Sequence, residues 1–293
     1  MISALPIPFC GVDPAIGRVD YASLPQQALM EMLIAEFENI GRICGSGDAS
    51  NDVADWDGVE VDAESSEVVR IVWQDLETGG SLDLRWLPST VRYFDVSEND
   101  IVGSINLSFI PPCAVTIHMF SNAFTGPIDL IALHDGLEQF DVAENKLTGS
   151  IELTHLPKSI KELNLSWNAF TGSVSLLQLP CELAYLHICG NQLSGSVDLN
   201  NLPVCLAILT LDSNCFSGKV NLKNLPKQLK IFSLSKNEFS GLTDFSQLPK
   251  SLHSFDVSNT KLSGVINVTT DEYPRCRFNV VNSQVSTKNR ASG

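Results

Sequence analysis

The side chains best suited to chemistry are two aspartates and a histidine that recur at one spacing. Asp95, His118 and Asp141 each lie twenty-three residues from the next. On adjacent strands of a parallel sheet, the backbones of residues at this spacing lie about 4.8 Å apart. The trio has the ligand types of a metal site, and a carboxylate can also orient a histidine as the base for Ser97 or Ser121. Charge pairing across an open sheet is the simpler interpretation, because an open face excludes no water.

Aromatic and further polar side chains flank the trio. In a strand, side chains alternate between the two faces, so these residues are expected on the solvent side of the same sheet. Large aromatic side chains that gather on a surface are typical of a contact patch. The candidate ligand-binding residues are Tyr93, Asp95, His118, Phe120, Asp141, Glu162, Trp167, Tyr185 and His187. We expect no catalytic residue, no cofactor and no bound metal.

A regular stack is needed to position these side chains, and a column of asparagines indicates one. An asparagine recurs every twenty-third residue, and a glycine follows four residues after each. A fixed period without a slip is typical of a solenoid, in which one coil stacks on the next. An asparagine amide both donates and accepts hydrogen bonds, so we expect the column to pair with backbone groups of its own and adjacent coils. The predicted structural asparagines are Asn99, Asn122, Asn145, Asn168, Asn191, Asn214 and Asn237.

The coil at residues 160–180 illustrates the expected local structure. Its first residues alternate between apolar and polar types, which predicts a strand with one buried face. Asn168 then turns the chain inward, and Gly172 allows a turn where a Cβ would collide. A second alternating pair, Val174 and Leu176, predicts a second short strand. The remaining length is too short for a full α-helix, so the outer side should be extended or 3₁₀.

These residues, L-x-x-L-x-L-S-x-N-x-F-x-G-x-V-x-L, resemble a leucine-rich repeat over about residues 68–267, in eight or nine coils. The G-x-V after the asparagine is similar to the plant-type subclass, although here the proline comes later. The resemblance implies an α/β-type solenoid that is mostly β, a curved right-handed leucine-rich repeat stack. It also implies a parallel sheet on the concave face, a 3₁₀ or extended convex side, and ligand binding on the concave face.

Both ends of such a stack need caps, because an open end exposes core and strand edges. At the amino end, apolar residues at helical spacing precede a Trp56-Asp-Gly-Val motif, which resembles the plant-type cap. That cap normally has a cysteine pair, but Val61 stands at one of the two positions, so we expect no cap disulfide. The predicted parts are a helical amino-terminal cap at 1–67, repeats at 68–270, and a carboxyl-terminal half-coil with a disordered tail from Ser283 at 271–293.

The charge balance narrows the class of partner. The formal net charge of −15 argues against nucleic acid and anionic membrane surfaces, and it favours a basic partner. No apolar run approaches the roughly 18 residues that a membrane span needs. We therefore expect a protein or peptide ligand, no nucleic acid and no membrane span.

The cysteines and the start of the chain bear on the compartment. The eight cysteines fall at unrelated positions of the repeat, and only Cys181 and Cys205 look close enough to bridge. Free thiols favour a reducing compartment. The start also lacks a basic segment followed by an apolar one, as a signal peptide would have. We expect an intracellular, cytoplasmic protein; a missing true start would instead allow a secreted or cell-surface one.

The hypothesis that follows is a non-enzymatic, monomeric scaffold that binds a protein or peptide through the concave sheet face. The alternative within binding proteins is a secreted or surface adhesion or receptor-like module. The rival class is a metal-dependent or hydrolytic enzyme built on Asp95, His118 and Asp141.

Overall fold

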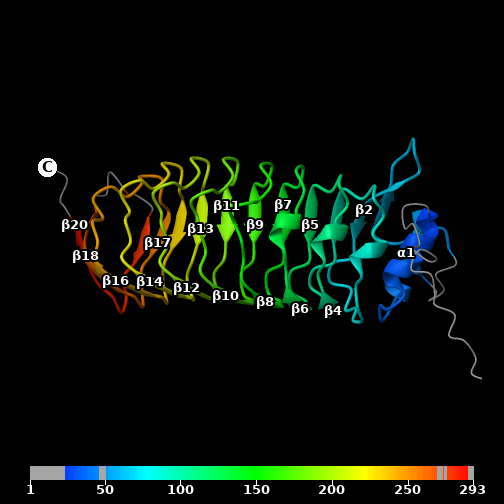
Figure 1. The fold of residues 1–293 in the computed structure, drawn as a ribbon, viewed down its shortest axis with the longest axis horizontal. Coiled ribbons are helices and arrows are strands. Elements are labelled where there is room, and N and C mark those ends of the chain that lie inside the picture. Colours follow the sequence, from blue (N-terminus) through cyan, green and yellow to red (C-terminus); the bar gives the residue numbers. More distant parts are fainter. Residues whose placement is uncertain (1–23, 46–50, 269–272, 274–275, 290–293) are drawn as a thin grey trace, which may run out of the picture.

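The described residues form one elongated stack of coils (Figure 1). The computed structural model describes residues 24–45, 51–268, 273 and 276–289. The stack runs from α1, drawn in blue at one end, to β18 and β20 in red at the other. The period of the sequence therefore predicted the architecture correctly. Residues 1–23 and 46–50 of the expected amino-terminal cap lie outside the described residues.

The first sheet has eleven strands and extends along the whole stack. β1 pairs antiparallel with β2, and every later neighbour pairs in parallel. The register places Asp95 opposite His118 and His118 opposite Asp141, as the spacing predicted. In spatial order the strands are β1 (Val59–Val61), β2 (Val68–Val72), β3 (Tyr93–Asp95), β5 (Thr116–His118), β7 (Gln139–Asp141), β9 (Glu162–Asn164), β11 (Tyr185–His187), β13 (Ile208–Thr210), β15 (Ile231–Ser233), β17 (Ser254–Asp256) and β19 (Arg277–Asn279).

A second sheet of nine strands lies along another side of the stack, at the bottom of Figure 1. Its strands are β4 (Val102–Ser104), β6 (Ala123–Pro127), β8 (Lys146–Gly149), β10 (Ala169–Gly172), β12 (Gln192–Gly195), β14 (Cys215–Gly218), β16 (Glu238–Leu242), β18 (Lys261–Val268) and β20 (Gln284–Asn289).

The second strand of each coil comes earlier than predicted. In the coil at 160–180 it is β10, and not the segment at Val174 and Leu176. Thr171 and Gly172 pair with the next coil immediately after the asparagine turn, where the spine fixes the distance between coils. Val174 and Leu176 are buried but lie outside the ladder. Their alternation reflects burial, which alone does not specify a strand.

The outer side of the first coils is 3₁₀ or extended, as expected. In η3, η4 and η5 the residue before the helix, such as Asn106, accepts a hydrogen bond from the backbone two residues later. The helices are α1 (Gln26–Ile34), α2 (Gly41–Cys44), η2 (Val53–Asp55), η3 (Leu84–Trp86), η4 (Leu107–Phe109) and η5 (Leu130–Ala132). None of these described helices is long and apolar enough to cross a membrane.

The asparagine column forms the predicted polar spine. The Asn168 Nδ2 donates to the carbonyls of Val142 (3.0 Å), Leu165 (3.3 Å) and Ser166 (3.1 Å). Its Oδ1 accepts from the Leu147 amide at 2.9 Å. The amide of each spine residue from Asn99 to Asn237 likewise donates to three carbonyls, one of them in the preceding coil. The spine thus satisfies backbone groups that the turns would otherwise leave unpaired.

The glycine four residues after each spine asparagine is required because the backbone there has a positive φ. Gly172 has φ +85°, a region that residues with a Cβ rarely adopt. A Cβ there would meet that of Ser150 at 3.5 Å, which is ordinary contact. The collision expected from the sequence is therefore absent at this position, and the left-handed turn is the reason for glycine.

A continuous apolar core fills the space inside the coils. Aromatic residues stack from coil to coil, for example Phe232 on Phe255 with ring centroids 5.5 Å apart and Phe216 on Phe239 at 6.1 Å. At the amino end Phe37 meets Trp73 edge-on at 6.2 Å, and Trp56 is buried. Leu33 and Ile34 of α1 are buried in the same core cluster, so the helix packs on the first coil. The domain boundaries at 67/68 and 270/271 stay predictions.

The segment after Ser283 differs from the expected disordered tail. Residues Gln284–Asn289 form β20, which pairs in parallel with β18. Val285 is buried within it. The polar composition suggested disorder, but pairing with β18 satisfies the backbone and one apolar side chain anchors the strand. Thr260 takes the spine position nearby, and its hydroxyl donates to the Val257 carbonyl at 2.7 Å.

The cysteines of the described chain are free. Cys181 and Cys205, which looked close enough to bridge, are exposed and unbonded. Burial raises the pKa of Cys113 and Cys189, and that of Cys276 to about 11. These three thiols are therefore protonated and poorly nucleophilic at neutral pH.

Candidate ligand-binding face

The solvent side of the first sheet, here called the sheet face, corresponds to the predicted concave face. From β3 to β17 each strand of this sheet buries its middle residue and directs its first and third side chains to this side. Parallel pairing aligns these side chains into two rows across the coils. The first-position row from β2 to β15 is Arg70, Tyr93, Thr116, Gln139, Glu162, Tyr185, Ile208 and Ile231, and the third-position row is Val72, Asp95, His118, Asp141, Asn164, His187, Thr210 and Ser233.

Asp95 is a structural residue of this face. Its side chain is buried, with a relative exposure of 4%, and its Oδ1 accepts from the Ser97 amide at 3.0 Å and hydroxyl at 2.5 Å. Its Oδ2 lies 3.6 Å from the His118 Nδ1. Burial by itself would raise the pKa of Asp95, but the hydrogen bonds from His118 and Ser97 outweigh it and lower the pKa. Both oxygens of Asp95 thus have partners within the chain, and the residue is buried.

Asp141, on the other side of His118, has a different environment. It is half-buried, and it accepts from the Ala143 amide and from the Asn164 Nδ2, both at 2.9 Å. Burial raises its pKa and outweighs these hydrogen bonds. The described contacts link His118 to Asp95 by a direct ion-pair distance and turn Asp141 towards Asn164. Among described residues no three His, Cys, Asp or Glu side chains are placed to hold a metal ion.

Tyr93, His118 and Phe120 pack edge-to-face. The Tyr93 and His118 ring centroids are 5.8 Å apart, and those of His118 and Phe120 are 6.3 Å apart. The Arg70 guanidinium lies over the Tyr93 ring at 3.7 Å. Tyr93 and Phe120 were expected to be exposed but are half-buried, because neighbouring coils supply these partners.

Trp167 and Tyr185 are the exposed aromatics of the sheet face. Trp167 has a relative exposure of 54% and Tyr185 of 39%. The indole of Trp167 lies against the next coil at Gly190, where an added Cβ would come within 2.6 Å of the ring. Gly190 therefore supports one part of the indole and leaves the rest in solvent. These two side chains meet the description of contact residues best.

Two further predicted residues lie near them. His187 is half-buried and its Nδ1 lies 3.1 Å from the Thr210 hydroxyl. Burial lowers the pKa of His187, so the ring is neutral at pH 7. Glu162 is half-buried and receives a long hydrogen bond of 3.5 Å from the Gln139 amide.

The sequence prediction omitted Ile208 and Ile231 from the site. Both follow Tyr185 in the first-position row, and Ile231 has a relative exposure of 36%. Together with Tyr185 they form an apolar row on the sheet face. The period places them in this row, and an apolar type at an outward position is the signal that identifies them.

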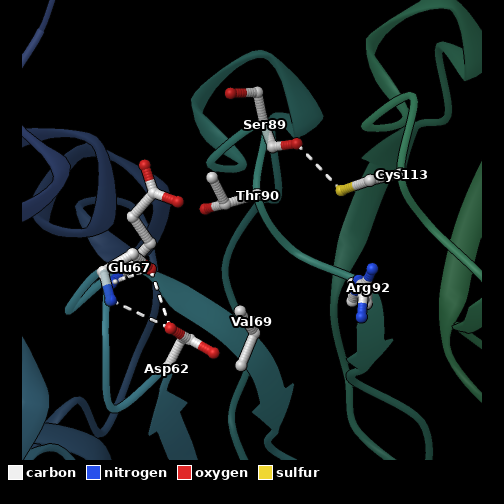
Figure 2. A pocket seen from close by; sticks show the side chains of 8 residues that line it. Asp62, Glu67, Val69, Ser89, Thr90, Arg92 and Cys113 are labelled. Atoms are coloured by element: carbon white, nitrogen blue, oxygen red, sulfur yellow. Dashed lines mark hydrogen bonds between the residues drawn. The ribbon is translucent and has the colours of Figure 1, made fainter.

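A separate cavity of about 450 Å³ lies beside the first strands (Figure 2). The Cys113 thiol, seen in the figure, donates to the Ser89 carbonyl at 3.0 Å. The Asp62 carboxylate accepts from the Ser65 amide at 2.9 Å, and these bonds lower the pKa of Asp62. The chain itself satisfies these polar groups, and the first-position and third-position side chains of the sheet face do not line this cavity.

Comparison with protein-family profiles and with curated protein sequences found no match. Solved structures do match. A plant ice-binding protein is 19% identical with a TM-score of 0.61, over 89% of this chain and 94% of that chain. The Arabidopsis receptor kinase HAESA, solved with the peptide hormone IDA and the co-receptor SERK1, is 20% identical with a TM-score of 0.62. The match covers 89% of this chain and 50% of the HAESA chain, so the chain spans about half of its length.

The ectodomain of the Arabidopsis thaliana receptor kinase GASSHO1/SCHENGEN3, in complex with CASPARIAN STRIP INTEGRITY FACTOR 2, is 19% identical with a TM-score of 0.59. The match covers 89% of this chain and 42% of that chain. At these identities the likeness concerns the fold. The fold of this chain is a leucine-rich repeat solenoid resembling the plant type, as the repeat motif predicted.

Proposed function

We propose that this protein is a non-enzymatic scaffold that binds a protein or peptide through the sheet face. The observation that supports this most is the exposure of Tyr185 on β11 and of Trp167 in the turn directly after β9. Exposed aromatic anchors on an ordered sheet are typical of binding hot spots. HAESA and GASSHO1/SCHENGEN3, which share the fold, are receptor kinases solved with a peptide hormone and with CASPARIAN STRIP INTEGRITY FACTOR 2, respectively.

The rival enzymatic interpretation has less support from the geometry. Asp95 is fully hydrogen-bonded, and no described contact joins His118 to Asp141. A nucleophile-activating histidine needs both an orienting partner and a reacting group within reach. Ser97, one of the two serines considered, donates its hydroxyl to Asp95 and not to His118.

The test of the main proposal is a comparative capture experiment. Immobilised wild type, a Trp167→Ala/Tyr185→Ala variant and a Leu177→Ala/Val204→Ala control are incubated with extract of the cells that produce the protein. Leu177 and Val204 are also exposed and apolar, but they lie in the segments that lead from the second sheet to the next strand of the first sheet. Loss of a hot-spot residue costs about 2 kcal/mol or more, so capture of the partner should fall roughly 30-fold in the double variant only. Equal capture by all three proteins would refute binding through this face.

A second candidate function is ice binding, and the second sheet is the observation that favours it. One hydroxyl residue per strand recurs every twenty-three residues from β6 to β18, and because each pairs with the residue twenty-one further on, the hydroxyls form an oblique row. A regular array of hydroxyls is complementary to a regular partner, and the plant ice-binding protein matches over 94% of its chain. The row is Thr125, Thr148, Thr171, Ser194, Ser217, Ser240 and Ser263.

Ice recrystallisation in a frozen sucrose solution tests this candidate. Wild type should keep ice grains small, and a Thr148→Lys/Thr171→Lys variant should lose that effect, because both side chains are exposed on the second sheet. The Trp167→Ala variant should behave as wild type. Grain growth equal to that with an inert protein would exclude the candidate.

We also propose that the protein is monomeric and cytoplasmic. The free state of all seven cysteines in the described chain is compatible with a reducing compartment. Light scattering after size exclusion tests the oligomeric state, and fractionation of the source cells tests the compartment. A receptor-like module at the cell surface would instead appear in the membrane or secreted fraction.

A further inference from the structure

The sheet face has two halves of different chemistry. From β3 to β9 its outward charged side chains include Asp95, Asp141 and Glu162, with His118 as the single basic type in either row. From β11 to β15 the first-position row is the apolar series Tyr185, Ile208 and Ile231. The boundary between the halves falls between β9 and β11, where Glu162 lies beside Tyr185.

The acidic half lacks a matching cation within the described chain. Glu162 and Asp141 form no ion pair, and their nearest hydrogen-bond donors are the neutral amides of Gln139 and Asn164. The neighbouring lysine, Lys161, pairs with Glu138 at 2.7 Å. Burial is the main cause of the raised pKa of Asp141; the charge of Glu162 adds to it and His118 opposes it, so the carboxylates share one basic side chain and a further cation would relieve their repulsion. Charge complementarity thus favours a basic group on the ligand.

The apolar half lacks a covering element of the described chain. Tyr185 and Ile231 have relative exposures of 39% and 36%, although neither needs to face solvent for the fold. Covering the exposed part of these side chains would remove apolar surface from water, which favours binding. Apolar groups on the ligand would provide this cover.

We propose that the sheet face binds an extended peptide with a basic residue and with apolar residues two and four positions away on one side of it. This rests on the proposed peptide-binding function and specifies its ligand. Glu162, Tyr185, Ile208 and Ile231 occupy one row on four consecutive strands. Three steps of about 4.8 Å span about 14 Å, and four residues of extended peptide span about 13 Å. A peptide crossing the strands therefore places its basic side chain at Glu162 and its apolar side chains along the apolar row.

The geometry also fixes the direction of the ligand. The basic side chain lies towards β7 and β9, and the apolar side chains lie towards β13 and β15. In the reverse direction an apolar side chain would contact Glu162 and leave its charge desolvated without a partner, which costs free energy. The contacts thus set the orientation of a given peptide on the row, and a peptide of reversed sequence fits by running the opposite way.

Selection from a display library of random linear twelve-residue peptides tests the proposal. Peptides that bind immobilised wild type are sequenced, synthesised and measured by fluorescence anisotropy. We expect enrichment of Lys or Arg with apolar residues at the second and fourth positions to one side. Glu162→Gln should weaken binding of these peptides at least 10-fold, and Ile231→Ser should weaken it to a similar degree.

Two controls show whether a loss of affinity comes from the missing Glu162 charge or from a general effect of the substitution on the protein. Glu152→Gln removes an exposed carboxylate outside both sheets and should leave affinity unchanged. Replacing the basic residue of the peptide by norleucine should weaken binding to wild type but not to the Glu162→Gln variant.

The outcomes distinguish this inference from the function on which it rests. Selected peptides that need Trp167 and Tyr185 but have no basic preference, or that ignore Glu162→Gln, overturn the ligand assignment and leave the proposed function standing. A library without any binder that depends on Trp167 or Tyr185 overturns the proposed function, and the ligand assignment with it.

Discussion

The asparagine spine and the sheet face are built on the same coils but follow opposite rules. Seven spine positions hold one residue type in one hydrogen-bonding arrangement, as at Asn122 and Asn168. The third-position row of the sheet face holds aspartate, histidine, asparagine, threonine and serine at equally regular positions. Every coil needs the same residue type at its spine position, because each turn leaves the same backbone groups without a hydrogen-bond partner. The sheet face has no such requirement, so its residue types are free to differ from coil to coil.

The comparison extends to the two aspartates beside His118. Asp95 and Asp141 occupy equivalent positions two coils apart, yet their pKa values are shifted in opposite directions. Asp95 gains hydrogen bonds from His118 and Ser97, whereas the burial of Asp141 is compensated less. Equivalent backbone positions therefore do not give equivalent chemistry.

The largest expected effect contrasts two asparagines of one coil. Asn168→Ala should lower the free energy of unfolding by about 3 kcal/mol, because it leaves the Leu147 amide and several carbonyls unpaired. Asn164→Ala, on the sheet face, should cost under about 1 kcal/mol, since its partner Asp141 is half-buried and reaches water. Equilibrium urea unfolding measures both. Similar losses from the two variants would contradict the division between spine and face.

The next effect concerns Asp95. Asp95→Asn should destabilise the protein at pH 7 by about 1–2 kcal/mol, because it weakens charge-assisted hydrogen bonds. The folded-state pKa of Asp95 lies below its usual value of 3.8, so this stabilisation is present above about pH 4 and lost as pH falls through the folded pKa. Urea unfolding from pH 7 to pH 3 should show the gap between wild type and variant closing. A gap that does not change with pH would contradict an ionised, paired Asp95.

Asp141 should show the opposite sign. Its folded-state pKa is raised, so the ionised carboxylate costs stability, and this cost appears as pH rises from about 3.8 through the folded pKa. Asp141→Asn should therefore stabilise the protein by up to about 1 kcal/mol at pH 7 and have no effect at pH 3. Urea unfolding of wild type and variant from pH 7 to pH 3 measures this difference in stability. Destabilisation at pH 7 would indicate that Asp141 behaves like Asp95.

The smallest effect concerns the residue before each spine asparagine. Lys236 there has φ +49°, which is a left-handed conformation that a Cβ disfavours. Lys236→Gly should stabilise the protein by about 0.5 kcal/mol, since relief of strain slightly exceeds the entropy that glycine loses. Thermal unfolding measures the shift. Lys219→Gly, a control at an exposed position without positive φ, should destabilise by a similar amount.

Much of the fold was predictable because local requirements repeat. The period gave the register of the first sheet, so the alignment of Asp95, His118 and Asp141 was predicted correctly. The spine contacts followed from the hydrogen-bonding capacity of an asparagine amide. The second strand was misplaced, because alternation at Val174 and Leu176 reports burial and not pairing. The strand at Gln284–Asn289 was missed, because a polar sequence does not reveal that β18 is available as its neighbour.

The site was predictable only in part. The rows were predicted from the period, and Trp167 and Tyr185 were correctly placed in solvent. The sequence alone, however, could not rank the candidates. One partner of the Asp95 carboxylate is His118 in the next coil. The indole of Trp167 is partly covered by Gly190, also in the next coil.

The sequence by itself determined the direction in which each side chain points, because a period of twenty-three residues without insertions fixes the position of every residue in its coil. The tertiary structure alone decided which outward side chains remain available. Availability depends on contacts between coils, and such contacts depend on the size and polarity of neighbours that repetition does not specify. For this reason Asp95 is occupied and Glu162 is free of an ion pair in the described chain, although both are carboxylates on the same face.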